Sequence, residues 1–442
     1  MIATPARRRP SGGARAAEAH PPAPAAAAGA IPPRLTLLLV AVLMALPLVL
    51  GGARLLTGPW FHQYNPREMS LVDGYPVSWE ATYYTDHLPT FASAARPGFG
   101  ISPVHYRTLI PLFVAAQLYA WTGHAYWSFA ATDLLFWGLA GVATVFLALR
   151  LGSRPWAAAL GGLLVSASPV LISHMWRHDL HTADFAGLPI ALWAATVLVD
   201  EPRPRWQLAG GLSLVLLLLS LSYQYQWLVA PLAFVLCATQ PRIGWLRGAA
   251  ITAAAVAGFL ALTAASEALF RVSVGDPTSW TGATVAPSSA LLGRLAAARS
   301  PGEVLDAARS VLPGWQQVVA VWRAYHPVVL LAGLAGVCAL GRRTIALTAT
   351  GTAVALVSHL VYPAPWTAAL CYPLIAIGAG VACATAGRVV ATRIRSGDAR
   401  LVCALGLALA LLCAAVTNLD LAGVPDFSLE WWRSYTNMQS RF

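Results

Sequence analysis

Long apolar runs of membrane-spanning length recur along this 442-residue chain and constrain its fold more than any other feature. A bilayer core is crossed by about 20 apolar residues in a helix. The chain is 57% hydrophobic and 11% charged, too poor in charge to cover the surface of a soluble enzyme and too apolar to be disordered. The runs are 35–53, 126–149, 155–173, 183–199, 206–222, 226–239, 245–267, 325–340, 343–361, 366–388 and 400–417. The sequence therefore predicts an all-α polytopic membrane protein.

Arginine placement predicts how these helices are oriented. All 29 basic residues are arginine, because the sequence contains no lysine. The short connections at 150–154, 200–205, 240–247, 341–343 and 388–400 hold twelve arginines, whereas the intervening short connections hold only Arg177. Since cytoplasmic loops are enriched in basic residues, the first group is expected to be cytoplasmic. The net charge of +11 is then an orientation signal, which argues against a nucleic-acid partner.

The stretch 105–121 is the ambiguous element, because its 17 residues only just reach across a bilayer. The arginine pattern is satisfied if this stretch lies in or on the membrane as an interfacial or re-entrant helix. That arrangement gives about 11 crossings in the cytoplasmic membrane, with a cytoplasmic N-terminus and an outer C-terminus. The alternative is about 12 crossings, with most of the short arginine connections outside.

The predicted organisation has five parts. Residues 1–34 form a disordered cytoplasmic tail, and 35–267 form an N-terminal transmembrane module that contains a first outer loop at 54–125. An outer loop at 268–324 carries an amphipathic helix that opens with a capping box, Ser300-Pro301-Gly-Glu303. The C-terminal helices occupy 325–417 and an outer tail 418–442. The six cysteines lie in apolar stretches, which predicts neither a disulfide framework nor a cysteine-based metal site.

Polar residues gather in two outer segments. The first loop contains Trp79-Glu80-Ala-Thr-Tyr83-Tyr84-Thr-Asp86 and then His105-Tyr-Arg107-Thr-Leu-Ile-Pro111. The second segment reads His174-Met-Trp-Arg177-His178-Asp179-Leu-His181-Thr-Ala-Asp184. Asp184 is expected in the first turn of a helix, where the helix dipole favours a carboxylate. Both segments also have simpler interpretations, as an interfacial helix with solvated carboxylates and as a helix cap with headgroup contacts.

A metal site and an intramembrane acid are further candidates. His174, His178 and His181 have the spacing of one helix face, so three imidazoles with a nearby carboxylate could bind a divalent cation such as Zn²⁺ or Mn²⁺. No cofactor is otherwise indicated. Asp133 lies about two turns into helix 126–149, where an ionisable group is costly. It could belong to a transport path, pair with an arginine, or be a hydrogen-bonded packing residue.

These motifs resemble the integral-membrane C-type glycosyltransferase superfamily, which includes the protein O-mannosyltransferases and the lipid A aminoarabinose transferases. The resemblance rests on Trp79-Glu80-Ala-Thr-Tyr83-Tyr84, on His105-Tyr-Arg107-Thr-Leu-Ile-Pro111, and on Arg177 followed by Asp184. It covers residues 35–200. The family's aspartate is glutamate at position 80, and Asp133 stands where many members have an arginine.

The resemblance implies transfer of a sugar from a polyprenyl-phosphate lipid to an acceptor at the outer face of the membrane. Glu80 would be the general base, and Asp86 or Asp184 would orient the acceptor or share that role. Arg107 or Arg177 would hold the phosphate. His178, Asp179, Tyr83 and Tyr84 complete the predicted substrate-binding set. The alternatives are a membrane transporter or lipid flippase, and a non-catalytic protein of envelope assembly; the sequence does not indicate an oligomeric state.

Overall fold

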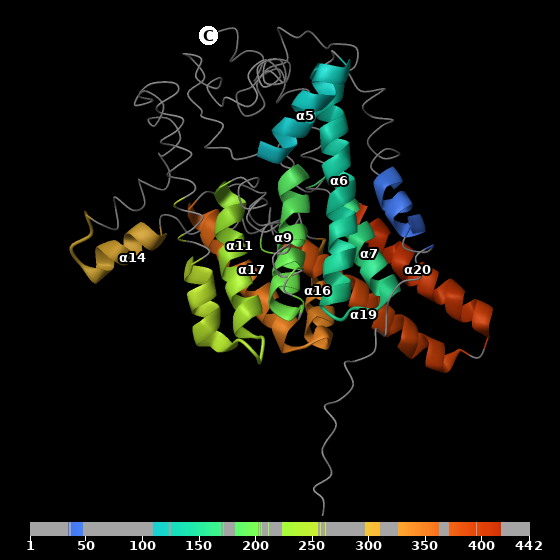
Figure 1. Cartoon of the computed structure of the whole chain (residues 1–442). Helices are drawn as coiled ribbons and strands as arrows, with labels where there is room; N and C mark the ends of the chain where they lie inside the picture. Colours follow the sequence, from blue (N-terminus) through green and yellow to red (C-terminus); the bar gives the residue numbers. More distant parts are fainter. Residues whose placement is uncertain are drawn as a thin grey trace, which may run out of the picture.

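The computed structural model describes residues 34, 37–46, 109–122, 125–168, 171, 182–201, 203, 205, 211, 223–254, 257, 261, 297–309, 326–361, 371–394 and 396–416. Within these ranges the chain is helical and contains no strand. The labelled helices are α5 (Leu109–Thr122), α6 (Ala125–Arg150), α7 (Pro155–Ser166), α9 (Thr182–Asp200), α11 (Tyr223–Ala238), α14 (Pro301–Arg309), α16 (Pro327–Leu340), α17 (Arg342–Val361), α19 (Tyr372–Arg393) and α20 (Gly397–Val416) (Figure 1).

Four helical spans in the described ranges are long and apolar enough to cross a membrane. They are Ala131–Arg150, Thr182–Asp200, Tyr372–Val390 and Gly397–Ala415. Length and composition therefore indicate a helical membrane protein. Leu37–Leu46, Pro155–Ser166 and Pro327–Leu340 are shorter apolar helices.

Some helix bounds agree closely with the predicted runs, whereas α7 ends at Ser166 and α19 ends at Arg393, although their runs were expected to end at 173 and 388. α6, α9 and α20 each begin and end within three residues of the apolar runs 126–149, 183–199 and 400–417. α11 begins at Tyr223, three residues earlier than expected, so it includes the residues predicted to form a short outer connection. The earlier start has a simple reason. A helix is defined by its backbone conformation, so it can include polar residues such as Gln224, which hydropathy alone assigns to a loop.

α19 is the central helix, and it packs against α16 on one side and α7 on the other. Gly378 lies against Gly333 and Gly336 of α16, so closely that a Cβ at Gly378 or Gly336 would clash with the partner's backbone. Two residues later, Gly380 lies against Ala157 and Gly161 of α7 in the same way. Since two residues correspond to about 200° around a helix, these glycines face opposite neighbours. Small residues permit both close crossings.

Around this centre the helices differ in exposure. In α9, 14 of the 19 residues are buried, so this helix lies inside the bundle, packed against α6 and α11. In α20, 11% of the span Gly397–Ala415 is buried, and Leu401, Val402 and Leu409 are exposed. α20 thus lies at the edge of the bundle, as a lipid-facing helix would.

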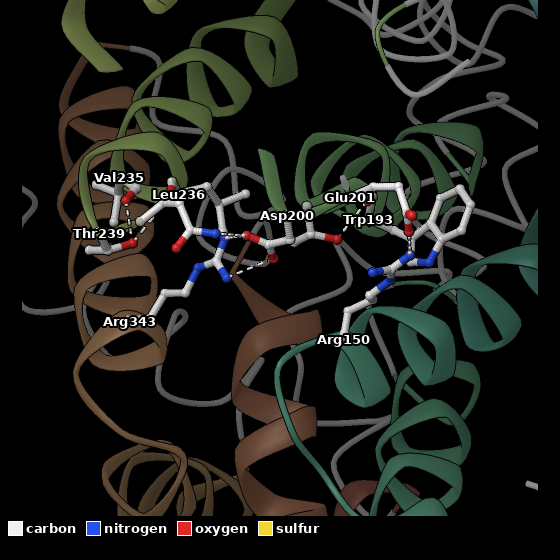
Figure 2. A network of polar contacts seen from close by, with 10 residues as sticks. Arg150, Trp193, Asp200, Glu201, Val235, Leu236, Thr239 and Arg343 are labelled. Atoms are coloured by element: carbon white, nitrogen blue, oxygen red, sulfur yellow. Dashed lines mark hydrogen bonds and ion pairs between the residues drawn. The ribbon is translucent and has the colours of Figure 1, made fainter. Parts of the chain in front are cut away.

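At one end of the bundle, charged and polar side chains form contacts between the ends of neighbouring helices (Figure 2). Arg343, at the start of α17, donates to both carboxylate oxygens of Asp200 at the end of α9, over 2.9 and 3.2 Å. Gln240, just after α11, donates to the same carboxylate over 2.7 Å. Arg150 at the end of α6 lies 3.9 Å from Glu201. We call this the arginine-rich end; the ends of α6, α9 and α11 and the start of α17 meet there.

The turns at this end are short. Gly152 follows α6 and Gly341 separates α16 from α17, and both adopt positive φ values, 89° and 99°. A side chain would be strained there, whereas glycine reverses the chain within a few residues. The connections predicted at 150–154 and 341–343 are therefore tight turns, whereas most of the connection predicted at 388–400 is helical, because α19 continues to Arg393 and α20 begins at Gly397.

Two smaller predictions concern α14 and α5. The predicted capping box is confirmed, because the Glu303 N–H donates to Ser300 Oγ over 3.2 Å and the Glu303 carboxylate accepts from the Arg299 N–H over 2.7 Å. α5 is a 14-residue helix that packs against α6 and lies oblique to it in Figure 1. At about 1.5 Å per residue it is about 21 Å long, shorter than a bilayer core.

Candidate functional site

Asp184 is the one predicted site residue that lies within the described part of the chain. The remaining predicted residues lie outside it: Glu80, Tyr83, Tyr84, Asp86, Arg107, Arg177, His178 and Asp179. The three histidines proposed as metal ligands, His174, His178 and His181, also lie outside it. The geometry of the site is therefore built from α6, α7 and α9, whose ends adjoin the two polar segments in sequence.

Asp184 lies in the first turn of α9 and is fully buried. The expectation that it would occupy the first turn of a helix is confirmed. At this position the free backbone N–H groups and the helix dipole stabilise negative charge, which offsets part of the cost of burying a carboxylate. The same turn begins with Thr182, which is also fully buried.

A hydrogen bond joins this turn to α6. The Thr182 hydroxyl donates to Asp133 Oδ1 over 2.7 Å, and both side chains are fully buried. Asp133 is the ninth residue of α6, which is the depth expected from the sequence. Of the three roles considered for Asp133, this bond corresponds to the hydrogen-bonded packing residue, because it holds the N-terminal parts of α6 and α9 together.

A second bond joins α6 to α7 one helical turn further on. Trp137 Nε1 donates to the Ser166 carbonyl over 2.7 Å, and the Trp137 side chain is fully buried. Ser166 is the last residue of α7, where carbonyls lack partners within the helix, so the indole satisfies one of them. We call Asp133, Trp137, Ser166 and Thr182 the polar junction; Asp184 lies two residues after Thr182 in α9.

The polar junction lies at the end of α6 and α9 that is opposite the arginine-rich end. Asp133 and Thr182 belong to the first halves of their helices, whereas Arg150 and Asp200 are the last residues of the same two helices. α6 and α9 are thus parallel, with buried acids near one end and arginine contacts at the other (Figure 1). Among the side chains whose burial the structure describes, no arginine or histidine is fully buried.

Carboxylates in such a setting are chemically suited to binding hydroxyl groups. They accept hydrogen bonds strongly in a low dielectric, and burial makes each contact more costly to lose. Within the described ranges, no three His, Cys, Asp or Glu side chains are grouped closely enough to hold a metal ion. The described part of the site therefore offers acids and hydroxyls, and the histidine hypothesis rests on residues outside it.

Sequence reasoning did not identify Thr182, Trp137 or Ser166 as members of the junction. One signal was present, since Asp133 and Trp137 are four residues apart and so share a face of one helix. Nothing in the local sequence indicates that this face meets Thr182, which is 49 residues away.

Known proteins offer no further guide to the site: no family model matches this chain, and no curated protein matches it. The likeness to C-type glycosyltransferases therefore rests on the motif residues quoted above.

Proposed function

We propose that the chain is a glycosyltransferase that moves a sugar from a polyprenyl-phosphate donor to an acceptor at the outer face of the cytoplasmic membrane. The observation that carries the proposal is the position of Asp184. This buried carboxylate lies in the first turn of α9, two residues after Thr182, toward the bundle end opposite the arginine contacts. An acid at that depth, next to a polar segment, is the arrangement that the motif resemblance implies.

The proposed topology has about 11 crossings, a cytoplasmic N-terminus and an outer C-terminus. Two findings support it. The arginines that end α6 and begin α17 gather at one end of the bundle, as a shared cytoplasmic side requires. α5 is also short for a membrane crossing, which suits an interfacial or re-entrant helix.

In the proposed reaction the Glu80 carboxylate removes the proton of an acceptor hydroxyl. The hydroxyl oxygen forms a bond to the anomeric carbon as the bond from that carbon to the phosphate oxygen breaks, and polyprenyl phosphate leaves. General base catalysis of this kind contributes about 10²–10⁴-fold. Asp184 acts as a positioning residue that orients the acceptor, with Asp86 as the alternative in that role.

The departing phosphate requires positive charge, and the guanidinium of Arg177 or Arg107 would supply a bidentate contact. Arg177 precedes Thr182 by five residues, and a peptide of that length spans at most about 18 Å. Arg107 precedes Leu109, the first residue of α5, which packs against α6. Both arginines are therefore connected by short stretches of chain to helices that form or contact the polar junction.

A transporter is the second candidate, and one observation favours it: Asp133 is buried inside an apolar helix, as acids on substrate pathways are. The contacts at the arginine-rich end argue against it, because Asp200 joins the ends of α9 and α11 to the start of α17. A path through the bundle would have to separate those contacts.

The test is to incubate the purified, reconstituted chain with radiolabelled polyprenyl-phosphate sugars and to follow the release of lipid phosphate. Glu80→Gln should reduce release by about 10²-fold or more while leaving the unfolding temperature unchanged. Glu68→Gln, in the same predicted loop, is the matched control and should retain full activity. Full activity of Glu80→Gln would refute the catalytic assignment, and counterflow of the sugar lipid without release of lipid phosphate would favour the transporter.

A further inference from the structure

Two turns at the arginine-rich end each combine an exposed tryptophan with arginine. The first connects α6 to α7, with Arg154 just before α7 and Trp156 as the second residue of that helix. The second follows α11, with Arg242 in the turn itself and Trp245 and Arg247 in the helical stretch that begins at Gly244. Trp156 is 41% exposed and Trp245 65% exposed, and all three arginines are exposed. We call these two segments, with their first helical residues included, the tryptophan–arginine turns.

The two turns flank the end of α9. Gln240, one residue before the second turn begins, donates to Asp200 over 2.7 Å. Arg150, just before the first turn, lies 3.9 Å from Glu201. Because Asp200 and Glu201 are adjacent in sequence, these contacts bring both turns to the same end of the bundle, where α6, α9 and α11 end at the lower side of the bundle in Figure 1.

The arginines of the turns differ from the other arginines at this end. Arg343 and Arg150 contact the two acids, Asp200 and Glu201. The side chains of Arg154, Arg242 and Arg247 form no hydrogen bond or ion pair within the described part of the chain. Three guanidinium groups are thus free to bind an anion from outside the bundle.

The neighbouring apolar side chains indicate what kind of anion. Trp245 is followed by Leu246, which is 66% exposed, so the second turn presents a large apolar surface beside its arginines. Exposed tryptophan at helix ends is typical of the membrane–water interface, where the ring lies at the level of the headgroups. Arginine binds phosphate oxygens through a bidentate fork. An anionic headgroup on an acyl chain satisfies both features, whereas a soluble anion would leave the apolar surface in water.

From these observations we infer that the tryptophan–arginine turns bind the phosphate groups of anionic phospholipids. The tryptophans set the depth of the turns in the leaflet, and Arg154, Arg242 and Arg247 contact the headgroups. The lipid occupies the bundle end opposite the polar junction, so this inference is independent of the proposed transferase activity. Binding is expected to weaken as salt is added, because the arginines are exposed to solvent.

The test uses the full chain in a neutral detergent, titrated with short-chain phosphatidylglycerol, with short-chain phosphatidylcholine, or with inorganic phosphate. Phosphatidylglycerol should raise the unfolding temperature in a saturable way, and the other two should not. The triple variant Arg154→Gln/Arg242→Gln/Arg247→Gln should bind phosphatidylglycerol about tenfold more weakly or worse. The variant Arg388→Gln/Arg393→Gln/Arg400→Gln, with three arginines outside the two turns, is the matched control and should bind normally.

A second measurement is native mass spectrometry of both variants, which counts retained phosphatidylglycerol molecules and does not depend on unfolding. Fewer retained lipids in the triple variant alone would support the inference. Equal shifts from phosphatidylglycerol and phosphatidylcholine, an equal shift from inorganic phosphate, or equal losses in the two triple variants would each overturn it.

Discussion

Thr182 carries the hydroxyl that joins α9 to α6, and its loss can be measured. Thr182→Val keeps the shape of the side chain but removes the donor to Asp133, which leaves one buried carboxylate oxygen without that bond. Interhelical hydrogen bonds in membrane proteins contribute about 1 kcal/mol. The variant should lower the free energy of unfolding by about 1–2 kcal/mol in mixed micelles.

The matched control for that substitution is Thr144→Val in α6. Thr144 is also fully buried, but its hydroxyl donates to the Ala140 carbonyl of its own helix, over 2.7 Å. That carbonyl keeps its backbone partner, so the change should be within about 0.5 kcal/mol. Equal losses in the two variants would contradict a special role for the bond between α6 and α9.

Asp184 offers a residue-scale test of the proposed function. Asp184→Asn keeps the size of the side chain and removes its charge, so it should lower kcat for sugar transfer by about 10–100-fold with little change in KM for the donor. Asp398→Asn is the control, because Asp398 also lies in the first turn of a helix but is exposed. A loss confined to KM for the donor would instead assign Asp184 to donor binding.

At the scale of elements, the close crossing of α16 and α19 is expected to contribute to the stability of the bundle. Gly336→Ala would place a methyl group against the Gly378 carbonyl of α19, where backbone atoms cannot move aside. Overpacking of this kind costs about 1–3 kcal/mol, so the unfolding temperature should fall clearly. Gly406→Ala in α20 is the control; its added Cβ meets open space, and the change should be neutral or slightly stabilising. An unchanged unfolding temperature of Gly336→Ala would show that α16 and α19 can move apart without loss of stability, and would contradict this prediction.

The contact between α9 and α17 is a second element-scale test. The Arg343 and Asp200 side chains are only 26% and 21% exposed, so their bidentate pair is less screened than a surface ion pair. Arg343→Gln and Asp200→Asn, combined in a double-mutant cycle of unfolding free energies, should give a coupling of about 1–2 kcal/mol. The exposed neighbour Arg342, substituted by Gln in place of Arg343, should show no coupling to Asp200.

At the scale of the whole molecule, the proposed topology predicts the side on which each end lies. Alkaline phosphatase fused after residue 442 should be active, because the C-terminus is expected outside. A green fluorescent protein fused after Arg247 should fluoresce, because that turn belongs to the arginine-rich end and is expected to be cytoplasmic. The reversed pattern would favour the alternative of about 12 crossings.

Much of the helical architecture follows from local sequence. Apolar runs predicted α6, α9 and α20 to within three residues, and Ser300 with Glu303 predicted the start of α14. Local sequence predicted less of the candidate site. Asp184 was correctly placed in a first turn, yet nothing in the local sequence indicated that Trp137 of α6 meets Ser166 of α7.

The sequence by itself determined that this chain is helical, which stretches are apolar enough for a membrane, and which turns carry arginine. Those properties depend on residues a few positions apart, so hydropathy and capping suffice to read them. Only the tertiary structure decided which polar groups meet: Asp133 with Thr182 across 49 residues, and Asp200 with Arg343 across 143. Such partners depend on which helix faces pack together, and glycine contacts such as those of Gly378 set that packing through close backbone approach.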